Sequence, residues 1–339
     1  MTKLRAIVVG AGGISGAWFP PLQKEKVEVA AVVDLDRKRA EEAVEKYQLK
    51  SAAVATDLDK VLREMKADFL VDLTVPESHC AVTCAALRAG LPVVGEKPMA
   101  ASMAEARRMV RASQKAGKLY MVSQSRRWDA RHDVLARTVA AGRVGRLTTL
   151  NCDFFLGAHF GGFRDEMPSP LILDMSIHHF DMARMIGGKD PVRVYAEEFN
   201  PKGSWYKGDV AANCIFEMTD GVRFAYRGSW CSEGCHTSWN GDWRIIGDRG
   251  TIIYERDLPP FGETAAGDEG FFRPKTPLAL VPSPLKFTGM HGSLREMLAH
   301  LRTGRKVQCE CHDNIKSLAM VFAAIESSHT GKRVNVRVM

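Results

Sequence analysis

Apolar residues in the first third of the chain come in short continuous runs, separated by segments with helical spacing. The runs cover residues 4–9, 27–33, 68–74, 91–95 and 119–123. Such runs are typical of strands that are buried on both faces of a parallel sheet. Helix signals lie between them, for example a capping box from Ser102 to Glu105. This alternation predicts a doubly wound parallel sheet over residues 1–123.

After residue 123 the strand-like segments become longer and are separated by Gly and Asp-Gly turns. They lie at residues 147–156, 192–199, 210–218, 223–230, 242–246, 251–254 and 333–338. Their pattern predicts an antiparallel or mixed sheet with one exposed face. Helical spacing recurs at 129–141, 171–186, 293–302 and 314–328. We therefore expect a second α/β domain over residues 124–339.

A glycine-rich turn directly follows the first strand, with the sequence Gly10-Ala-Gly12-Gly13-Ile14-Ser15. Gly10 permits a tight turn, and Gly12 lets the backbone approach a pyrophosphate. A helix beginning near Gly13 offers free N–H groups to that phosphate. The small Ser15 stands where the dinucleotide-binding fingerprint has its third glycine. We expect the helix to be short, because Pro20 and Pro21 interrupt it.

Asp34 ends the second strand at the distance of about 20 residues that the dinucleotide fingerprint requires. A carboxylate there accepts both hydroxyls of the adenosine ribose and repels a 2′-phosphate, which favours NAD over NADP. Residues 37–39, Arg-Lys-Arg, can bind a phosphate, so NADP stays possible. The alternative structural role of Asp34 is to cap a helix over residues 37–48.

Glu96, Lys97 and Pro98 follow the strand at 91–95. Ligands of open α/β sheets lie at the carboxyl ends of the strands, where Thr74 and Pro76 are also expected. A lysine at that edge can donate or accept a proton. The alternative interpretation is a solvated Glu-Lys pair.

The helix predicted at 171–186 carries Asp174, His178 and Asp181 on one face, since they are spaced at i, i+4 and i+7. His179 points elsewhere. A metal site is not predicted, because the chain has no H-E-x-x-H pattern. The Cys309–His312 and Cys231–Cys235 segments do not have the spacing of a four-ligand zinc module, so we expect core or surface thiols.

The order of these motifs resembles that of the Gfo/Idh/MocA oxidoreductase family, which includes glucose–fructose oxidoreductase and the inositol dehydrogenases. The motifs are the glycine turn, residues 71–79, Glu96-Lys97-Pro98, residues 125–128 and the Asp174–Asp181 helix. The resemblance implies a Rossmann domain followed by an α/β domain with a large open sheet, often used for oligomerisation. It implies catalytic roles for Lys97, Asp174 and His178. We expect cofactor contacts from Gly10, Gly12, Gly13, Ile14, Ser15, Asp34, Thr74, Pro76, His79, Glu96 and Lys97, and substrate contacts from Arg127, Trp128, Arg164 and Asp181.

Charge and composition limit which partners and which cellular location we expect for this protein. The net charge of +7 is spread over 47 basic and 40 acidic side chains without a nucleic-acid-binding motif, so nucleic acid is not an expected partner. No apolar run is long enough to span a bilayer, and the eight cysteines fit reduced thiols, which predicts a cytoplasmic protein. We expect a homodimer or homotetramer and a carbohydrate or polyol substrate.

Three functional hypotheses follow. The first is an NAD(P)-dependent dehydrogenase of a sugar, inositol or sugar acid, in which either Lys97 or His178 takes the hydroxyl proton. The second is a redox-neutral glycoside hydrolase that oxidises C3 transiently, eliminates the glycoside and reoxidises its NADH. The third is a non-enzymatic dinucleotide-binding regulator, against which the intact Lys97 and His178 argue. Trp230, Trp239 and Trp243 either belong to the core or wall a sugar site, since aromatic faces stack on sugar C–H surfaces.

Overall fold

The computed structural model describes residues 3–338, which form two compact units. The first unit comprises the chain up to Trp128 and the returning segment Phe287–Ile315. The second comprises Asp129–Lys286 and Lys316–Val338. The functional division into a cofactor-binding part at residues 1–123 and a substrate-binding part at 124–339 stays a prediction.

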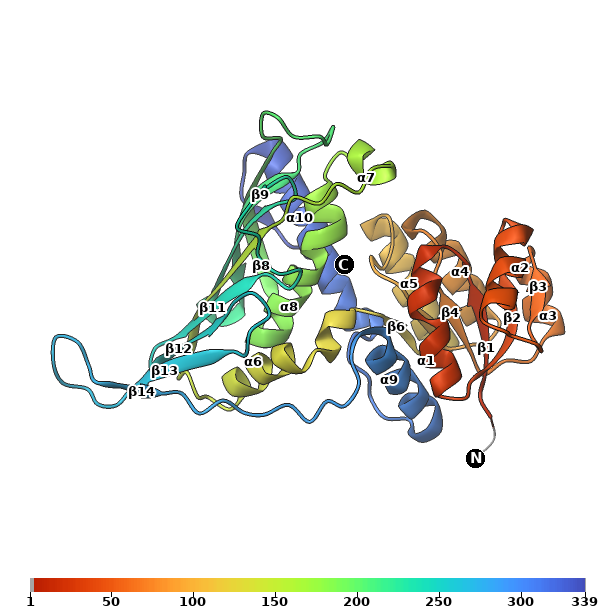
Figure 1. Cartoon of the computed structure of the whole chain (residues 1–339), viewed down its shortest axis with the longest axis horizontal. Coiled ribbons are helices and arrows are strands. Elements are labelled where there is room, and N and C mark those ends of the chain that lie inside the picture. Colours follow the sequence, from red (N-terminus) through yellow and green to blue (C-terminus); the bar gives the residue numbers. More distant parts are fainter. Residues whose placement is uncertain (1–2, 339) are drawn as a thin grey trace. The chain divides into compact units, whose positions relative to one another are not determined.

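The first unit is built on a six-stranded parallel sheet in the order β3-β2-β1-β4-β5-β6 (Figure 1). The doubly wound parallel sheet predicted from the alternation is confirmed. Its strands are β1 (Arg5–Val9), β2 (Glu28–Val33), β3 (Ala53–Ala55), β4 (Phe69–Asp72), β5 (Val93–Gly95) and β6 (Tyr120–Val122). Its helices are η1 (Gly13–Ala17), α1 (Phe19–Lys24), α2 (Arg37–Lys46), α3 (Leu58–Glu64), α4 (Pro76–Arg88), α5 (Met103–Ala116), η2 (Ser125–Trp128) and α9 (Gly289–Thr303).

The strand register brings the carboxyl ends of four strands into line. Val9 pairs with Val33 of β2 and with Asp72 of β4, and Asp72 pairs with Gly95 of β5. These strands consist of valine, alanine and other apolar residues that are buried on both faces, as a covered parallel sheet requires. The residues that follow the strands therefore lie at one edge of the sheet, among them Gly10, Asp34, Thr74 and Lys97.

One local prediction was wrong, and one alternative is excluded. Pro20 and Pro21 do not interrupt a helix; they occupy the first turn of α1, where their missing N–H groups need no partner, after a separate 3-10 helix η1. The cap of α2 is Asp36, whose side chain accepts a hydrogen bond from the Lys38 N–H. Asp34 is thus not the helix cap that was its alternative role.

The second unit is built on a nine-stranded mixed sheet in the order β14-β13-β12-β11-β7-β10-β9-β8-β15. Neighbouring strands are antiparallel except for the parallel pair β7 and β10. The predicted mixed sheet is confirmed. Its strands are β7 (Leu147–Phe155), β8 (Pro191–Phe199), β9 (Ala211–Met218), β10 (Arg223–Ser229), β11 (Asp242–Gly247), β12 (Gly250–Tyr254), β13 (Phe261–Ala265), β14 (Lys275–Pro277) and β15 (Val334–Asn335).

Helices cover one face of this sheet and leave the other open. In Figure 1, α6 (Ala130–Ala140) and α8 (Ile177–Gly187) lie on the same side of the strands, and α8 packs on β7. The short elements are α7 (Phe163–Glu166), η3 (Leu171–Ser176) and η4 (Thr219–Gly221), and α10 (Cys311–Thr330) begins in the first unit and continues in the second. Between residues 3 and 338, no helix has the length and hydropathy needed to cross a membrane.

Candidate active site

The turn after β1 is shaped for a ligand's close approach. The Gly10 N–H donates to the Val33 carbonyl oxygen at 2.8 Å, and its φ of +95° lies in the region that glycine favours. A Cβ atom at Gly10 would stand 2.6 Å from the Leu73 carbonyl oxygen, so no other residue fits. Gly12 and Gly13 are exposed and face open space, whereas Ser15 is buried, as close packing at the third fingerprint position requires. Ile14, between them, is 38% exposed.

The Asp34 carboxylate is held in a defined orientation at the neighbouring strand end. The Ala11 N–H donates to its Oδ2 at 2.7 Å, and the Asp36 N–H donates to its Oδ1 at 2.9 Å. Each carboxylate oxygen can accept a further hydrogen bond. The side chain is therefore fixed by the backbone and still able to receive the two hydroxyls of a ribose.

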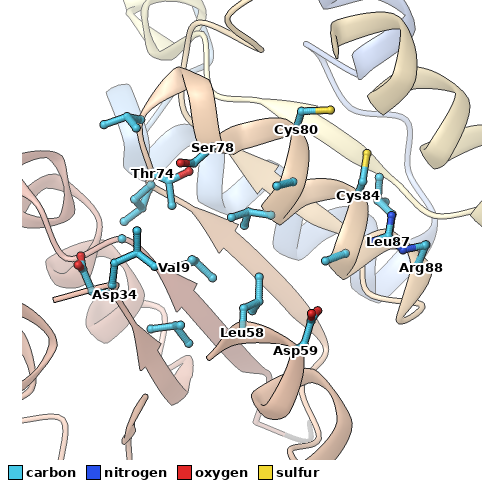
Figure 2. Close-up of a pocket in the computed structure, with 18 of the residues that line it drawn as sticks. Val9, Asp34, Leu58, Asp59, Thr74, Ser78, Cys80, Cys84, Leu87 and Arg88 are labelled. Atoms are coloured by element: carbon cyan, nitrogen blue, oxygen red, sulfur yellow. The ribbon is translucent and has the colours of Figure 1, made fainter. Parts of the chain in front are cut away.

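A cavity of about 1430 Å³ lies above this strand edge and includes Gly10, Gly12 and Asp34 in its lining. Figure 2 shows Asp34, Thr74 and Ser78 bordering the cavity, whose wall continues along α4 past Cys84 to Arg88. The part of the cavity beside Gly10, Gly12 and Asp34 lies where the fingerprint places a dinucleotide, and the rest extends along α4 and α5. The open glycine turn, the oriented carboxylate and the cavity together fit NAD.

Thr74, Pro76 and His79 shape the next turn of this edge. The Thr74 hydroxyl donates to Asp72 Oδ1 at 2.6 Å, which fixes the end of β4, and Pro76 opens α4. The His79 ring is buried between two carbonyl oxygens, with Nδ1 at 2.9 Å from Pro98 O and Nε2 at 2.9 Å from Thr74 O. The ring thus ties the turn after β4 to the turn that carries Lys97.

Glu96 is buried beneath Lys97 and has a partner that the sequence did not reveal. The Trp18 indole Nε1–H donates to Glu96 Oε1 at 2.7 Å, and both side chains are buried. Burial raises the pKa of Glu96, although the Trp18 hydrogen bond and the Lys97 charge act in the opposite direction. Trp18 therefore positions the carboxyl group next to the candidate catalytic lysine. No motif marks Trp18, because its contact joins residues far apart in the chain.

In the second unit, the predicted helix is divided between η3, which is π-helical, and α8. Asp174 lies in η3, and its Oδ2 accepts a hydrogen bond from Arg164 Nε at 2.7 Å. His178 stands in the first turn of α8 and is partly exposed. Asp181 is only 1% exposed and accepts a hydrogen bond from the Ser317 hydroxyl at 2.7 Å. The structure thus brings Arg164 to Asp174 but places Asp181 in a buried contact with α10.

Two further substrate candidates hold structural contacts within the first unit. Arg127 is 8% exposed, and its Nη2 lies 3.7 Å from Asp313 Oδ2. The Trp128 Nε1–H donates to Glu296 Oε2 at 2.8 Å, and the Trp128 side chain packs against Gly292 of α9. Both side chains fasten the returning segment, and their roles toward a substrate stay predictions.

The cysteine-rich segments contain thiols. The eight cysteines are free, and Cys309 and Cys311 are buried, as expected for core thiols. Glu310, Cys311 and His312 bring one carboxylate, one thiol and one imidazole within 4.8 Å of one another. His312 Nδ1 lies 2.6 Å from Glu310 Oε1, so this carboxylate and ring already pair with each other.

Comparison with known proteins identifies both parts of the chain. The model of the oxidoreductase family with an NAD-binding Rossmann fold matches residues 4–124, and the model of the Gfo/Idh/MocA C-terminal domain matches residues 132–253. The chain belongs to the Gfo/Idh/MocA oxidoreductase family. The expectations of a nicotinamide-dependent dehydrogenase and of NAD as its cofactor are confirmed at the level of this family.

Members of the Gfo/Idh/MocA family are similar to the chain over different lengths. A D-apiose dehydrogenase of Paraburkholderia graminis is 25% identical, with 91% of this chain and 83% of that protein covered. Inositol 2-dehydrogenase 4 of Saccharopolyspora erythraea is 31% identical, with 57% of this chain and 56% of that protein covered. A crystal structure of an oxidoreductase from Agrobacterium radiobacter, in complex with NAD⁺, L-tartaric acid and magnesium, has a TM-score of 0.85, 22% identity and 99% coverage of both chains. That structural likeness shows the shared fold.

Proposed function

We propose that this protein is an NAD-dependent dehydrogenase that oxidises a secondary hydroxyl group of a sugar, an inositol or a sugar acid. The observation that carries the proposal is the Arg164–Asp174 pair, which lies with His178 in the matched C-terminal domain of the family. Relatives named as dehydrogenases of D-apiose and of inositol support the substrate class.

In this proposal the cofactor accepts the hydride, and the residues of the chain handle the hydroxyl proton. The oriented Asp34 carboxylate binds the adenosine ribose and favours NAD over NADP. Lys97 and His178 hydrogen-bond the reacting oxygen, and one of them takes its proton. Asp174 orients the His178 ring or binds a neighbouring hydroxyl, and Arg164 controls the availability of its Oδ2 atom. Asp174, His178 and Lys97 are the proposed catalytic residues.

The first experiment is to measure absorbance of reduced nicotinamide when the protein is incubated with NAD or NADP and with inositols, aldoses, sugar acids or their glycosides. We expect a rise with one free sugar or polyol, and a higher kcat/KM with NAD. Release of an aglycone that requires NAD, without net reduction of the cofactor, would replace the dehydrogenase by the redox-neutral hydrolase.

Lys97→Ala and His178→Ala test the catalytic assignment. We expect each change to lower kcat by ~10²–10⁴-fold, because each removes a group that handles the proton. Binding of NAD, measured by calorimetry, should stay within about twofold of the wild type. Turnover near that of the wild type in either variant would contradict the assignment. The pH–rate profiles of the two variants then separate the base from its hydrogen-bonding partner.

We also propose that the protein is cytoplasmic and assembles as a homodimer or homotetramer through the open face of the nine-stranded sheet. Exposed apolar side chains on β8 and β9 support this assembly, since Tyr195 is 44% exposed and its cross-strand neighbour Ile215 is 55% exposed.

A further inference from the structure

Three loops of the second unit bring six aromatic rings together next to Arg164, the hydrogen-bond partner of Asp174. The rings belong to His159, Phe160, Trp205, Tyr206, Trp230 and Trp239, and we call them the aromatic cluster. His159 stacks on Trp205 with centroids 3.7 Å apart, and Tyr206 lies parallel to Trp230 at 6.4 Å. Phe160 packs edge to face on Trp230 at 5.1 Å, and Trp239 lies 6.0 Å from Phe160. The rings therefore form one continuous group.

The three tryptophans whose roles were open after the sequence analysis have different surroundings. Trp243 belongs to the core, since it is 1% exposed and its Nε1–H donates to the Asn240 carbonyl oxygen at 2.8 Å. Trp230 is also buried, at 2% exposed, and Trp239 is 46% exposed. Packing alone accounts for Trp243. It does not account for the half-exposed Trp239, nor for Phe160, which is 43% exposed beside it.

The aromatic cluster and the neighbouring Asp165 carry buried polar atoms that lack partners. Among the described residues 3–338, Trp230 Nε1 is buried without a hydrogen-bond acceptor, and Asp165 Oδ1 is buried without a donor. Buried polar atoms in proteins are nearly always hydrogen-bonded, so each of these two atoms needs an explanation. A hydroxyl group both donates and accepts, and is therefore the chemical group that can complete either atom.

A short chain of contacts joins the aromatic cluster to the proposed catalytic residues. The Arg164 guanidinium lies over the Phe160 ring at 5.0 Å, and its Nε donates to Asp174 Oδ2 at 2.7 Å. The carboxylate of Asp165, the residue after Arg164, lies close enough to Tyr206 to affect the pKa of its hydroxyl group. Burial raises the pKa of Tyr206 to about 12, and the Asp165 carboxylate adds to the increase. A ligand on the rings would thus be separated from Asp174 by the Arg164 side chain alone.

We propose that the aromatic cluster is the subsite that binds the carbohydrate ring of the substrate. Phe160 and Trp239 present aromatic faces to the apolar C–H surface of the ring. After a small opening of the surrounding loops, the Trp230 Nε1–H donates a hydrogen bond to one hydroxyl group of the ring. Asp165 Oδ1 accepts a hydrogen bond from another. The proposal rests on the proposed dehydrogenase function, for which it names the residues that select the substrate.

The test is to titrate the full-length protein, saturated with NADH, with myo-inositol, D-xylose, D-glucose and D-glucuronate in a calorimeter. The variant is Phe160→Leu, and the matched control is Phe271→Leu, an aromatic residue that is 96% exposed on another loop of the same unit. We expect Phe160→Leu to weaken binding of the preferred probe by about fivefold, because it removes a stacking face. The control should bind as the wild type does.

Trp230→Phe tests the hydrogen bond, because it removes the N–H donor and keeps an aromatic, though smaller, ring at this position. We expect KM for the preferred probe to rise about tenfold, with kcat changed by less than about twofold. If Trp230→Phe does not fold, Trp239→Leu, which removes an exposed stacking ring, tests the subsite by a raised KM in the same assay. Unchanged affinity in Phe160→Leu and unchanged KM in the second variant would overturn the subsite.

The two proposals fail in different ways. If a probe binds and Phe160→Leu weakens it, but no probe reduces NAD, the subsite stands and the dehydrogenase falls. If a probe reduces NAD and the variants keep their KM, the dehydrogenase stands and the subsite falls.

Discussion

Glu198 shows how a single side chain can set the pH dependence of stability. It lies on the covered face of β8, is 8% exposed, and receives a hydrogen bond from the Ser169 hydroxyl at 3.2 Å. Its other oxygen, Oε1, is buried and lacks a partner among residues 3–338. Burial, opposed by the Ser169 hydrogen bond and reinforced by Asp209, raises the pKa of Glu198 from 4.5 to about 7.

This shift predicts that the free energy of unfolding falls as the pH rises from 4.5 to about 7. In that window the folded state keeps a proton that the unfolded state has released, so the raised pKa stabilises the fold at low pH and no longer does so above pH 7. Glu198→Gln, which stays neutral, should be more stable than the wild type at pH 8 by ~2–3 kcal/mol and equal to it near pH 4. Urea unfolding at both pH values measures this difference.

Glu197→Gln is the control, since Glu197 is the exposed neighbour on the same strand. Its effect should stay below ~0.5 kcal/mol at both pH values. Equal stability of wild type and Glu198→Gln at pH 8 would show that ionisation of the buried carboxyl group does not lower the free energy of unfolding.

Among the helices, α9 returns to the first unit and is fastened to the end of α1 by one carboxylate. Glu25 Oε1 lies 2.7 Å from His291 Nε2 and 2.9 Å from Arg295 Nη1. Burial by itself raises the pKa of Glu25, but the hydrogen bonds from His291 and Arg295 outweigh it, and the net pKa is lowered from 4.5. The packing of α9 against α1 therefore depends on an ionised carboxylate.

Glu25→Gln should lower the free energy of unfolding by about 1–2 kcal/mol at pH 7. A lowered pKa in the folded state stabilises the protein above the ordinary value of 4.5, and this contribution disappears as the pH falls through the folded-state pKa. The two proteins should therefore converge in thermal or urea unfolding as the pH falls well below 4.5. Glu41→Gln, which breaks the exposed pair with Arg37, is the control and should have almost no effect. A constant difference at all pH values would exclude the ionic origin.

For the molecule as a whole, the open face of the nine-stranded sheet is the surface to test for assembly. Ile215 stands opposite Tyr195 in the register of β8 and β9, and both side chains are exposed. Exposed apolar patches on proteins often mark contacts between chains. Ile215→Glu should convert a homodimer or homotetramer into smaller species, as measured by size-exclusion chromatography with light scattering. Glu197→Gln, which replaces one exposed polar side chain of β8 by another, should leave the molar mass unchanged. A wild-type protein that is already a monomer would contradict the proposed assembly.

Prediction from the sequence succeeded where the signal was local. Strands β1, β2, β4, β5 and β6 are continuous apolar runs, and the Ser102–Glu105 capping box opens α5, because a few adjacent side chains decide these features. Strands β3, β13 and β14 escaped prediction because they have no buried side chains and are defined by backbone pairing with the neighbouring strands. Their side chains carry little pattern.

The features of the candidate site also fall into two groups, those that local sequence motifs predicted and those that only the structure shows. The glycine turn, Asp34, Lys97 and the spacing of Asp174 and His178 were visible in the sequence, since each motif is defined within a few residues. The contacts Trp18–Glu96, Arg164–Asp174 and Ser317–Asp181 were not visible. The spacing that predicted one face for Asp174, His178 and Asp181 assumed an unbroken α-helix, and the π-helical η3 changes that register.

Periodicity and short motifs were therefore enough to establish a parallel dinucleotide-binding sheet, a mixed second sheet and the type of cofactor, because these depend on neighbouring residues along the chain. Which carboxylates are buried, which tryptophans belong to the core and which lie in the aromatic cluster depended on contacts between segments far apart in sequence. Trp230 and Trp243 are equally apolar in the sequence, yet only the folded chain gives Trp243 an acceptor for its N–H and leaves Trp230 without one. Such partners are chosen by long-range packing, and the local pattern of a sequence does not contain them.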